Sequence, residues 1–150
     1  MSIDYKNIAT AEATPYASSM IETFRAIGYS LETAVADIID NSISAGAKNI
    51  WINRYWHGGQ SVLTIKDEGC GMNNNELVNA LRPGTINPLA EREATDLGRF
   101  GLGLKTASFS QCRKPSVISK RANYMPVYWA WDLDYVAQTN QWSLIHWCPE

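Results

Sequence analysis

Residues 37–42, DIIDNS, are the stretch on which the interpretation of this chain depends. Ser30 is a favourable N-cap, so we predict a helix over residues 31–45 that contains this stretch. Residues four apart share a helix face, so Asp37 and Asn41 project together. A carboxylate beside a carboxamide can take a proton from water and can hold a hard metal ion through the amide oxygen. The alternatives are a polar helix face that only contacts solvent, or an Asn41 side chain that bonds a neighbouring loop.

A second group of polar residues and glycines follows directly. Two β-prone runs, 48–56 and 60–66, flank a Gly-Gly turn and predict an antiparallel hairpin. The hairpin leads into residues 67–72, DEGCGM, which we predict to be a loop. Its two glycines let the backbone approach a flat ligand closely, and an ionised Asp67 can accept the exocyclic amine of a base. An ordinary turn is the alternative, since this short pattern is weak by itself.

A third group is residues 98–105, GRFGLGLK, which precede a predicted helix over 104–111. Free N–H groups at a helix N-terminus favour phosphate, and Lys105 adds a positive charge. The spacing GxxGxG is not the dinucleotide-binding fingerprint, and no GxxxxGK[ST] occurs, which excludes a P-loop ATPase. The preceding residues 82–97 form a long stretch typical of a functional loop. A flexible entry to the helix is the alternative.

The order of the other predicted elements indicates the fold class. A helix over 18–27 follows an N-terminal arm of residues 1–15, and Asn73 or Asn74 caps a short helix that reaches Leu81. Residues 116–121, 124–131 and 141–147 read as strands. Strands and helices do not alternate strictly, so we predict an α+β fold with a mixed, mainly antiparallel sheet covered by helices on one face.

The three groups, in this order, resemble the GHKL ATPases, the superfamily of gyrase B, the heat-shock chaperones, histidine kinases and MutL. The resemblance extends from about Ser30 to Ser119. Residues 40–47, DNSISAGA, and the run GLGLK that ends at Lys105 look most like MutL and the MORC ATPases. The resemblance implies a Bergerat fold, a two-layer α/β sandwich. It also implies that residues 1–150 are one ATP-binding domain, as an N-terminal fragment of a longer protein, with residues 82–97 as the ATP lid.

The resemblance also implies roles for individual residues, with ATP and Mg²⁺ as cofactors. Asp67 would accept the adenine amine, and Gly69, Gly71 and Met72 would wall the base. Asn41 would be the Mg²⁺ ligand, and Asp37 stands where the family has its general base. Lys105 would also act in catalysis. The residues that would contact the phosphates are Gly98, Arg99, Phe100, Gly101, Leu102, Gly103, Leu104 and Lys105.

This sequence departs from the family's pattern at two positions. Asp37 replaces the usual glutamate and is one methylene shorter, so the attacking water must sit closer or hydrolysis is slower. Ser44 replaces an aspartate that normally helps to hold the pocket. Ser119 and Ser143 are both candidates for the family's late threonine, which contacts the adenine-binding aspartate.

Three functions follow from the resemblance. The leading hypothesis is slow, Mg²⁺-dependent ATP hydrolysis to ADP, coupled to lid closure and to nucleotide-dependent homodimerisation, with nucleic acid reached through further domains. The Asp37 substitution favours an alternative, an ATP-binding switch that does not hydrolyse. A histidine kinase catalytic domain is the third possibility, and the run Ala45-Gly46-Ala47 argues against it.

Composition excludes several other classes of protein. The chain carries 13 basic and 15 acidic residues, so a chain-wide basic surface for nucleic acid is excluded. No apolar run approaches the roughly 18 residues of a membrane helix, and no secretory signal is visible. Three separated cysteines indicate free thiols, and we expect a cytoplasmic protein, or a nuclear one in a eukaryote. We expect sheet packing, with a partner surface as the alternative, for Trp51, Trp56, Trp129, Trp131, Trp142 and Trp147.

Overall fold

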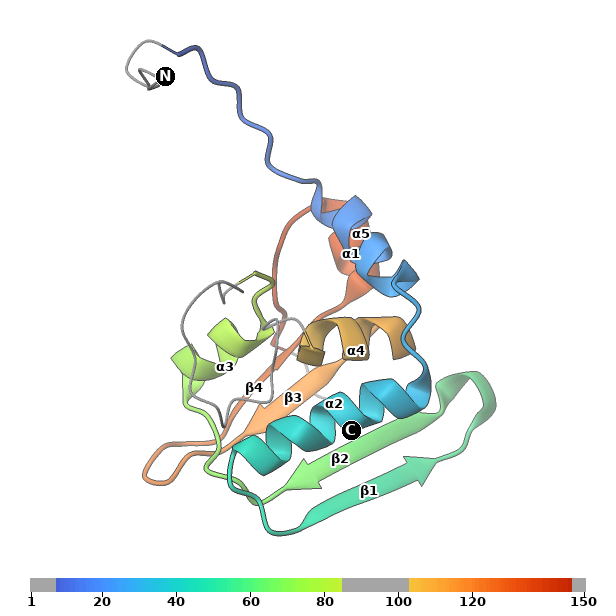
Figure 1. The fold of residues 1–150 in the computed structure, drawn as a ribbon, viewed down its shortest axis with the longest axis vertical. Helices are drawn as coiled ribbons and strands as arrows, with labels where there is room; N and C mark the ends of the chain where they lie inside the picture. The colour runs from blue at the N-terminus through green and yellow to red at the C-terminus, as the bar shows by residue number, and fades with distance from the viewer. Residues whose placement is uncertain (1–7, 85–102, 147–150) are drawn as a thin grey trace, which may run out of the picture.

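The computed structural model describes residues 8–84 and 103–146 of the chain (Figure 1). Helices and strands both occur in these residues, which confirms the α+β class. None of the helices in these two stretches has the length and apolar character needed to cross a membrane. The elements are α1 (Ala17–Ala26), α2 (Leu31–Ser44), β1 (Ile50–Tyr55), a 3₁₀ turn (Gly58–Gln60), β2 (Val62–Asp67), α3 (Asn74–Leu81), α4 (Gly103–Gln111), β3 (Ser116–Ser119), β4 (Val127–Ala130) and α5 (Leu133–Thr139).

The described strands form two antiparallel pairs rather than one mixed sheet. β1 pairs with β2 from Ile50 opposite Asp67 to Tyr55 opposite Val62, as the hairpin prediction required. β3 pairs with β4, with Ser116 opposite Ala130. Between the two pairs, the backbone N–H of Met72 donates to the Ser119 hydroxyl at 2.8 Å. The two pairs are therefore joined through a loop and a side chain in place of a strand ladder.

The starts of α2 and α3 follow the capping residues in the sequence. The Ser30 hydroxyl accepts from the Thr33 N–H at 3.2 Å and begins α2. Asn73, not Asn74, is the N-cap of α3, and it forms a capping box with Glu76. α2 packs along α4, and Figure 1 shows these two helices side by side across the strands. Two of the three polar groups predicted from sequence thus stand on, or lead into, neighbouring helices.

The hydrophobic core lies between α1, α3, α4, α5 and the end of β4. Phe109 of α4 is 1% exposed and lies at its centre. The Phe109 ring packs against Phe24 at 6.5 Å and meets Trp131 edge-on at 5.7 Å between centroids. The core is thus formed between these helices, and no residue of the β1–β2 hairpin belongs to it. Its buried members are Ala17, Ile21, Phe24, Leu77, Leu81, Phe109, Trp131, Leu133 and Val136.

Two sequence predictions near the C-terminus are wrong. Helix α5 was not predicted; its signal was Asp132, whose side chain accepts from the N–H groups of Asp134 and Tyr135 and so begins the helix. The predicted strand over 141–147 is reduced, within the described residues, to one bridge between Ile145 and Ala130. In that segment Leu144 packs against the core and Trp142 meets Trp131 edge-on, but no paired strand forms in the described residues.

The tryptophans divide between two environments. Trp131 is 2% exposed and belongs to the core, as expected of packing residues. On the hairpin, Trp51 and Trp56 are 45% and 73% exposed, so the expectation that they pack against the sheet is wrong for these two. Lys66 lies over the Trp51 ring and Arg54 over the Trp56 ring, each 5.5 Å from the centroid. Cationic side chains therefore cover part of the exposed indole surface.

Candidate functional site

Asp67 ends β2 and is held by two hydrogen bonds from different parts of the chain. Its Oδ1 accepts from the Gly69 N–H at 2.9 Å, and its Oδ2 accepts from the Ser42 hydroxyl at 3.0 Å. Ser42 lies on α2 and is only 3% exposed. The carboxylate is thereby fixed in its plane against the helix that carries Asp37 and Asn41. The structure brings the first and second polar groups of the sequence together at this point.

The two loop glycines are required by contacts within the protein. A Cβ on Gly69 would lie 2.7 Å from the Cβ of Ala45, while the Cys70 N–H donates to the Ala45 carbonyl at 2.9 Å. Gly71 has a φ of +65°, and a Cβ there would overlap the carbonyl oxygen of Lys120. We expected these glycines to give a ligand close access to the backbone. The structure adds a second reason, which is that the loop closes tightly on α2 and on the turn after β3.

That turn is fastened to the loop on its other side as well. The Met72 N–H donates to Ser119, and Arg121 forms an ion pair with Glu76 at the start of α3. The backbone N–H of Asn73 and then the guanidinium of Arg121 lower the pKa of Glu76. Of the two candidate serines, Ser119 therefore lies at the loop, whereas Ser143 lines a separate cavity.

Asp37 and Asn41 stand one turn apart on α2, as predicted. Asp37 is half-buried and Asn41 is exposed. In residues 8–84 and 103–146, neither side chain has a hydrogen bond or an ion pair. Both oxygen-bearing groups are therefore available for a ligand on this face of α2.

The third group is only partly within the described residues. Helix α4 begins at Gly103 and packs along α2, the helix that carries Asp37 and Asn41. Leu104 is half-buried behind this start. The predicted phosphate contacts outside the described residues are Gly98, Arg99, Phe100, Gly101 and Leu102, together with residues 85–97 of the predicted lid.

Lys105 occupies an unexpected place. Its side chain is buried, at 4% residue exposure, and its Nζ donates to the Arg82 carbonyl oxygen at 3.0 Å. Arg82 is the C-cap of α3, so the ammonium sits at the negative end of that helix. Burial lowers the pKa of Lys105. The ammonium thus links α4 to the end of α3, and a contact with phosphate remains a prediction.

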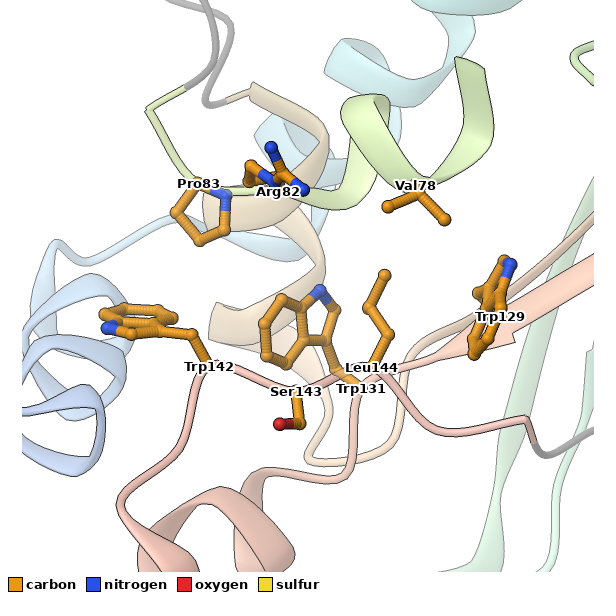
Figure 2. Close-up of a pocket in the computed structure, with 8 residues that line it drawn as sticks. All are labelled: Val78, Arg82, Pro83, Trp129, Trp131, Trp142, Ser143 and Leu144. Atoms are coloured by element: carbon orange, nitrogen blue, oxygen red, sulfur yellow. The ribbon is translucent and has the colours of Figure 1, made fainter. Parts of the chain in front are cut away.

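A separate cavity of about 580 Å³ lies beside α3 (Figure 2). The indole N–H groups of Trp129 and Trp131 donate to Asn74 Oδ1 at 2.9 Å and to the Leu81 carbonyl at 3.2 Å. Both rings are thus fixed in orientation, and the three tryptophans form an apolar wall opposite Val78 and Pro83. None of the lining residues belongs to the three polar groups described above. They are Val78, Arg82, Pro83, Trp129, Trp131, Trp142, Ser143 and Leu144.

The described residues fit a purine nucleotide and a hard cation. A carboxylate has about four acceptor positions, and two of those on Asp67 are taken by Ser42 and Gly69. The others can accept the amine of adenine. Asn41 has an amide oxygen available, the kind of ligand that Mg²⁺ prefers. The sequence identified both residues, but it gave no indication that Ser42 would hold Asp67.

Comparison with known proteins identifies the family. The family model for the histidine kinase-, DNA gyrase B- and HSP90-like ATPases matches residues 29–149. ATPase morc-1 of Caenorhabditis elegans is 27% identical over 89 residues, which are 59% of this chain and 10% of that protein. ATPase MORC2B of Mus musculus is 34% identical over 97 residues, 61% of this chain and 9% of that protein. The DNA mismatch repair protein MutL of Dictyoglomus turgidum is 28% identical over 113 residues, 74% of this chain and 20% of that protein. The chain thus spans about a fifth or less of the length of these relatives.

Proposed function

The chain belongs to the histidine kinase-, DNA gyrase B- and HSP90-like ATPase family, and from this membership we propose that it binds Mg-ATP and hydrolyses it slowly. One observation carries the proposal at the level of residues. The Ser42 hydroxyl and the Gly69 N–H fix the Asp67 carboxylate at the end of β2, and Ser42 follows Asn41 directly on α2. The proposed adenine acceptor is therefore held by the residue that follows the proposed Mg²⁺ ligand.

Each residue then has one task. Asp67 accepts the adenine amine, and Gly69, Gly71 and Met72 form the wall beside the base. Asn41 holds Mg²⁺ through its amide oxygen, and the ion supplies charge neutralisation at the phosphates. Asp37 takes the proton of the attacking water. The segment from Gly98 to Lys105 donates to the phosphates at the start of α4, as a helix N-terminus can.

Lid closure by residues 82–97 and nucleotide-dependent self-association belong to the same proposal, as does a cytoplasmic or nuclear location. Two of the relatives are ATPases by name and one is a DNA mismatch repair protein. A role on nucleic acid, through parts of a longer protein, is accordingly part of the proposal. A switch that binds ATP without turnover is the second candidate, because Asp37 is shorter than glutamate by one methylene.

Calorimetric titration with ATP, with and without Mg²⁺, tests the binding. We expect binding in both conditions and tighter binding with the ion. Asn41→Ala should remove the gain from Mg²⁺ and leave adenosine binding nearly unchanged, because adenosine has no phosphate to bring the ion. Equal losses for adenosine and Mg-ATP would mean that the substitution had damaged α2. Phosphate release in a single turnover, compared with Asp37→Asn, distinguishes the hydrolase from the switch.

A further inference from the structure

Among residues 8–84 and 103–146, Ser42 is the one buried hydroxyl with a hydrogen bond to the proposed adenine acceptor. It is 3% exposed, and its Oγ lies 3.0 Å from Asp67 Oδ2 and 3.2 Å from the Ile38 carbonyl oxygen. Both neighbours are acceptors, so the hydroxyl proton must point to one of them, and Ser42 can act toward Asp67 only as a donor. The charged carboxylate is the stronger of the two acceptors.

The contacts of Asp67 then determine what a base can offer it. Gly69 donates to one oxygen and Ser42 to the other, so both oxygens are fixed by protein donors. Toward the base, the Asp67 carboxylate can therefore act only as a hydrogen-bond acceptor. Adenine presents an amine there, whereas hypoxanthine presents a carbonyl oxygen, which would meet another acceptor.

We propose that Ser42 is a positioning residue that sets the preference for adenine by holding Asp67 in one orientation. This inference rests on the proposed function, since it needs Asp67 to meet the base. A hydrogen bond to a charged group is worth roughly tenfold to 150-fold in an equilibrium constant. Because the carboxylate can partly relax, we expect the low end of that range.

The test compares the affinities of ATP and ITP for the wild-type chain and for Ser42→Ala. We expect Ser42→Ala to weaken ATP binding about tenfold while ITP binding stays within about twofold, so the ATP:ITP preference falls about fivefold or more. Ser19→Ala is the control, because Ser19 is exposed on α1, a helix that carries none of the proposed site residues. It should leave both affinities unchanged.

Ser42→Cys keeps a weak donor of similar size and should recover part of the preference. The thermal midpoint without nucleotide shows whether Ser42→Ala folds. If it does not, Ser42→Cys is the variant that decides the proposal. Equal losses for ATP and ITP would overturn the inference and make Ser42 structural, as would no loss at all. Failure of the wild-type chain to bind ATP would instead overturn the proposed function.

Discussion

The two ends of the proposed nucleotide site are built differently. At the adenine end, Asp67 is held by Ser42 and Gly69, and Met72 is held by Ser119. At the phosphate end, the side chains of Asp37 and Asn41 have no hydrogen-bond partners in the part of the chain that the structure describes.

This difference suggests how binding and chemistry are divided. Groups already fixed in position lose little freedom when a ligand arrives, so the adenine end should govern affinity. Groups without protein partners can rearrange around Mg²⁺ and phosphate, so the phosphate end should govern turnover. Substitutions at the adenine end should therefore weaken binding of the nucleotide itself, whereas those at the phosphate end should change turnover or the part of the affinity that depends on Mg²⁺.

Asp37→Ala should produce the largest effect, and on turnover alone. A general base contributes typically 10²–10⁴-fold, so phosphate release should fall by about that factor while Mg-ATP still binds. Rapid quench of a single turnover measures the rate, and calorimetry measures binding. Loss of binding would place Asp37 among the structural residues. Unchanged turnover would move the base elsewhere, with Asp40 or Glu68 as the next candidates.

Gly71→Ala should have the next largest effect, and on affinity. The added Cβ would overlap the Lys120 carbonyl, so the loop that walls the base must move, and overpacking strain of about 1–3 kcal/mol would lower the affinity roughly five- to 150-fold. Gly46→Ala is the matched control, because Gly46 also has a positive φ, +79°, but nothing lies within 4 Å of its Cβ position. It should cost only the backbone strain of about 1–2 kcal/mol in stability, with ATP affinity unchanged. Equal loss of affinity in both variants would show that backbone strain, and not the contact with Lys120, is responsible.

Asp67→Asn should weaken ATP binding by roughly five- to 150-fold. The amide can turn a donor toward the adenine amine, and a buried unmatched polar group costs about 1–3 kcal/mol. Competition with a fluorescent ATP analogue measures the loss. The affinity for Mg²⁺-pyrophosphate, which has no base, should be unaffected and serves as the internal control. Unchanged ATP affinity would remove Asp67 from the site.

The sequence predicted the local features of this site well, because they depend on local chemistry. Ser30 and the polar face of α2 follow from capping and from the period of a helix, and the β1–β2 hairpin follows from its Gly-Gly turn. The Ser42–Asp67 bond was not predictable, since it joins residues 25 apart through the packing of a helix on a strand end. Ser42 in the sequence looked no different from exposed Ser44.

The errors have a physical cause in common. Helix α5 depends on Asp132 and on burial of Leu133 and Val136, and neither its short length nor its flanking tryptophans suggested a helix. Residues 141–147 have strand-like composition, but Trp142 of this segment lines the wall of a cavity. Tertiary packing overrode local propensity in both segments.

Lys105 should have the smallest effect, which is a change in how the stability of the folded chain depends on pH. Burial lowers its pKa in the folded chain, so just below the ordinary lysine value of about 10.4 the unfolded chain binds more protons. Stability therefore rises with pH as the folded-state penalty is relieved, and Lys105→Met should lack this rise. Urea unfolding of both proteins from about pH 7.5 up to about pH 10.4 measures the difference, and groups common to both cancel. If the free energies of unfolding of the two proteins changed in parallel with pH, the burial of the Lys105 ammonium would be contradicted. In the same variant, weaker Mg-ATP binding would assign Lys105 to the phosphate end, whereas unchanged binding would leave it as a link between α4 and Arg82.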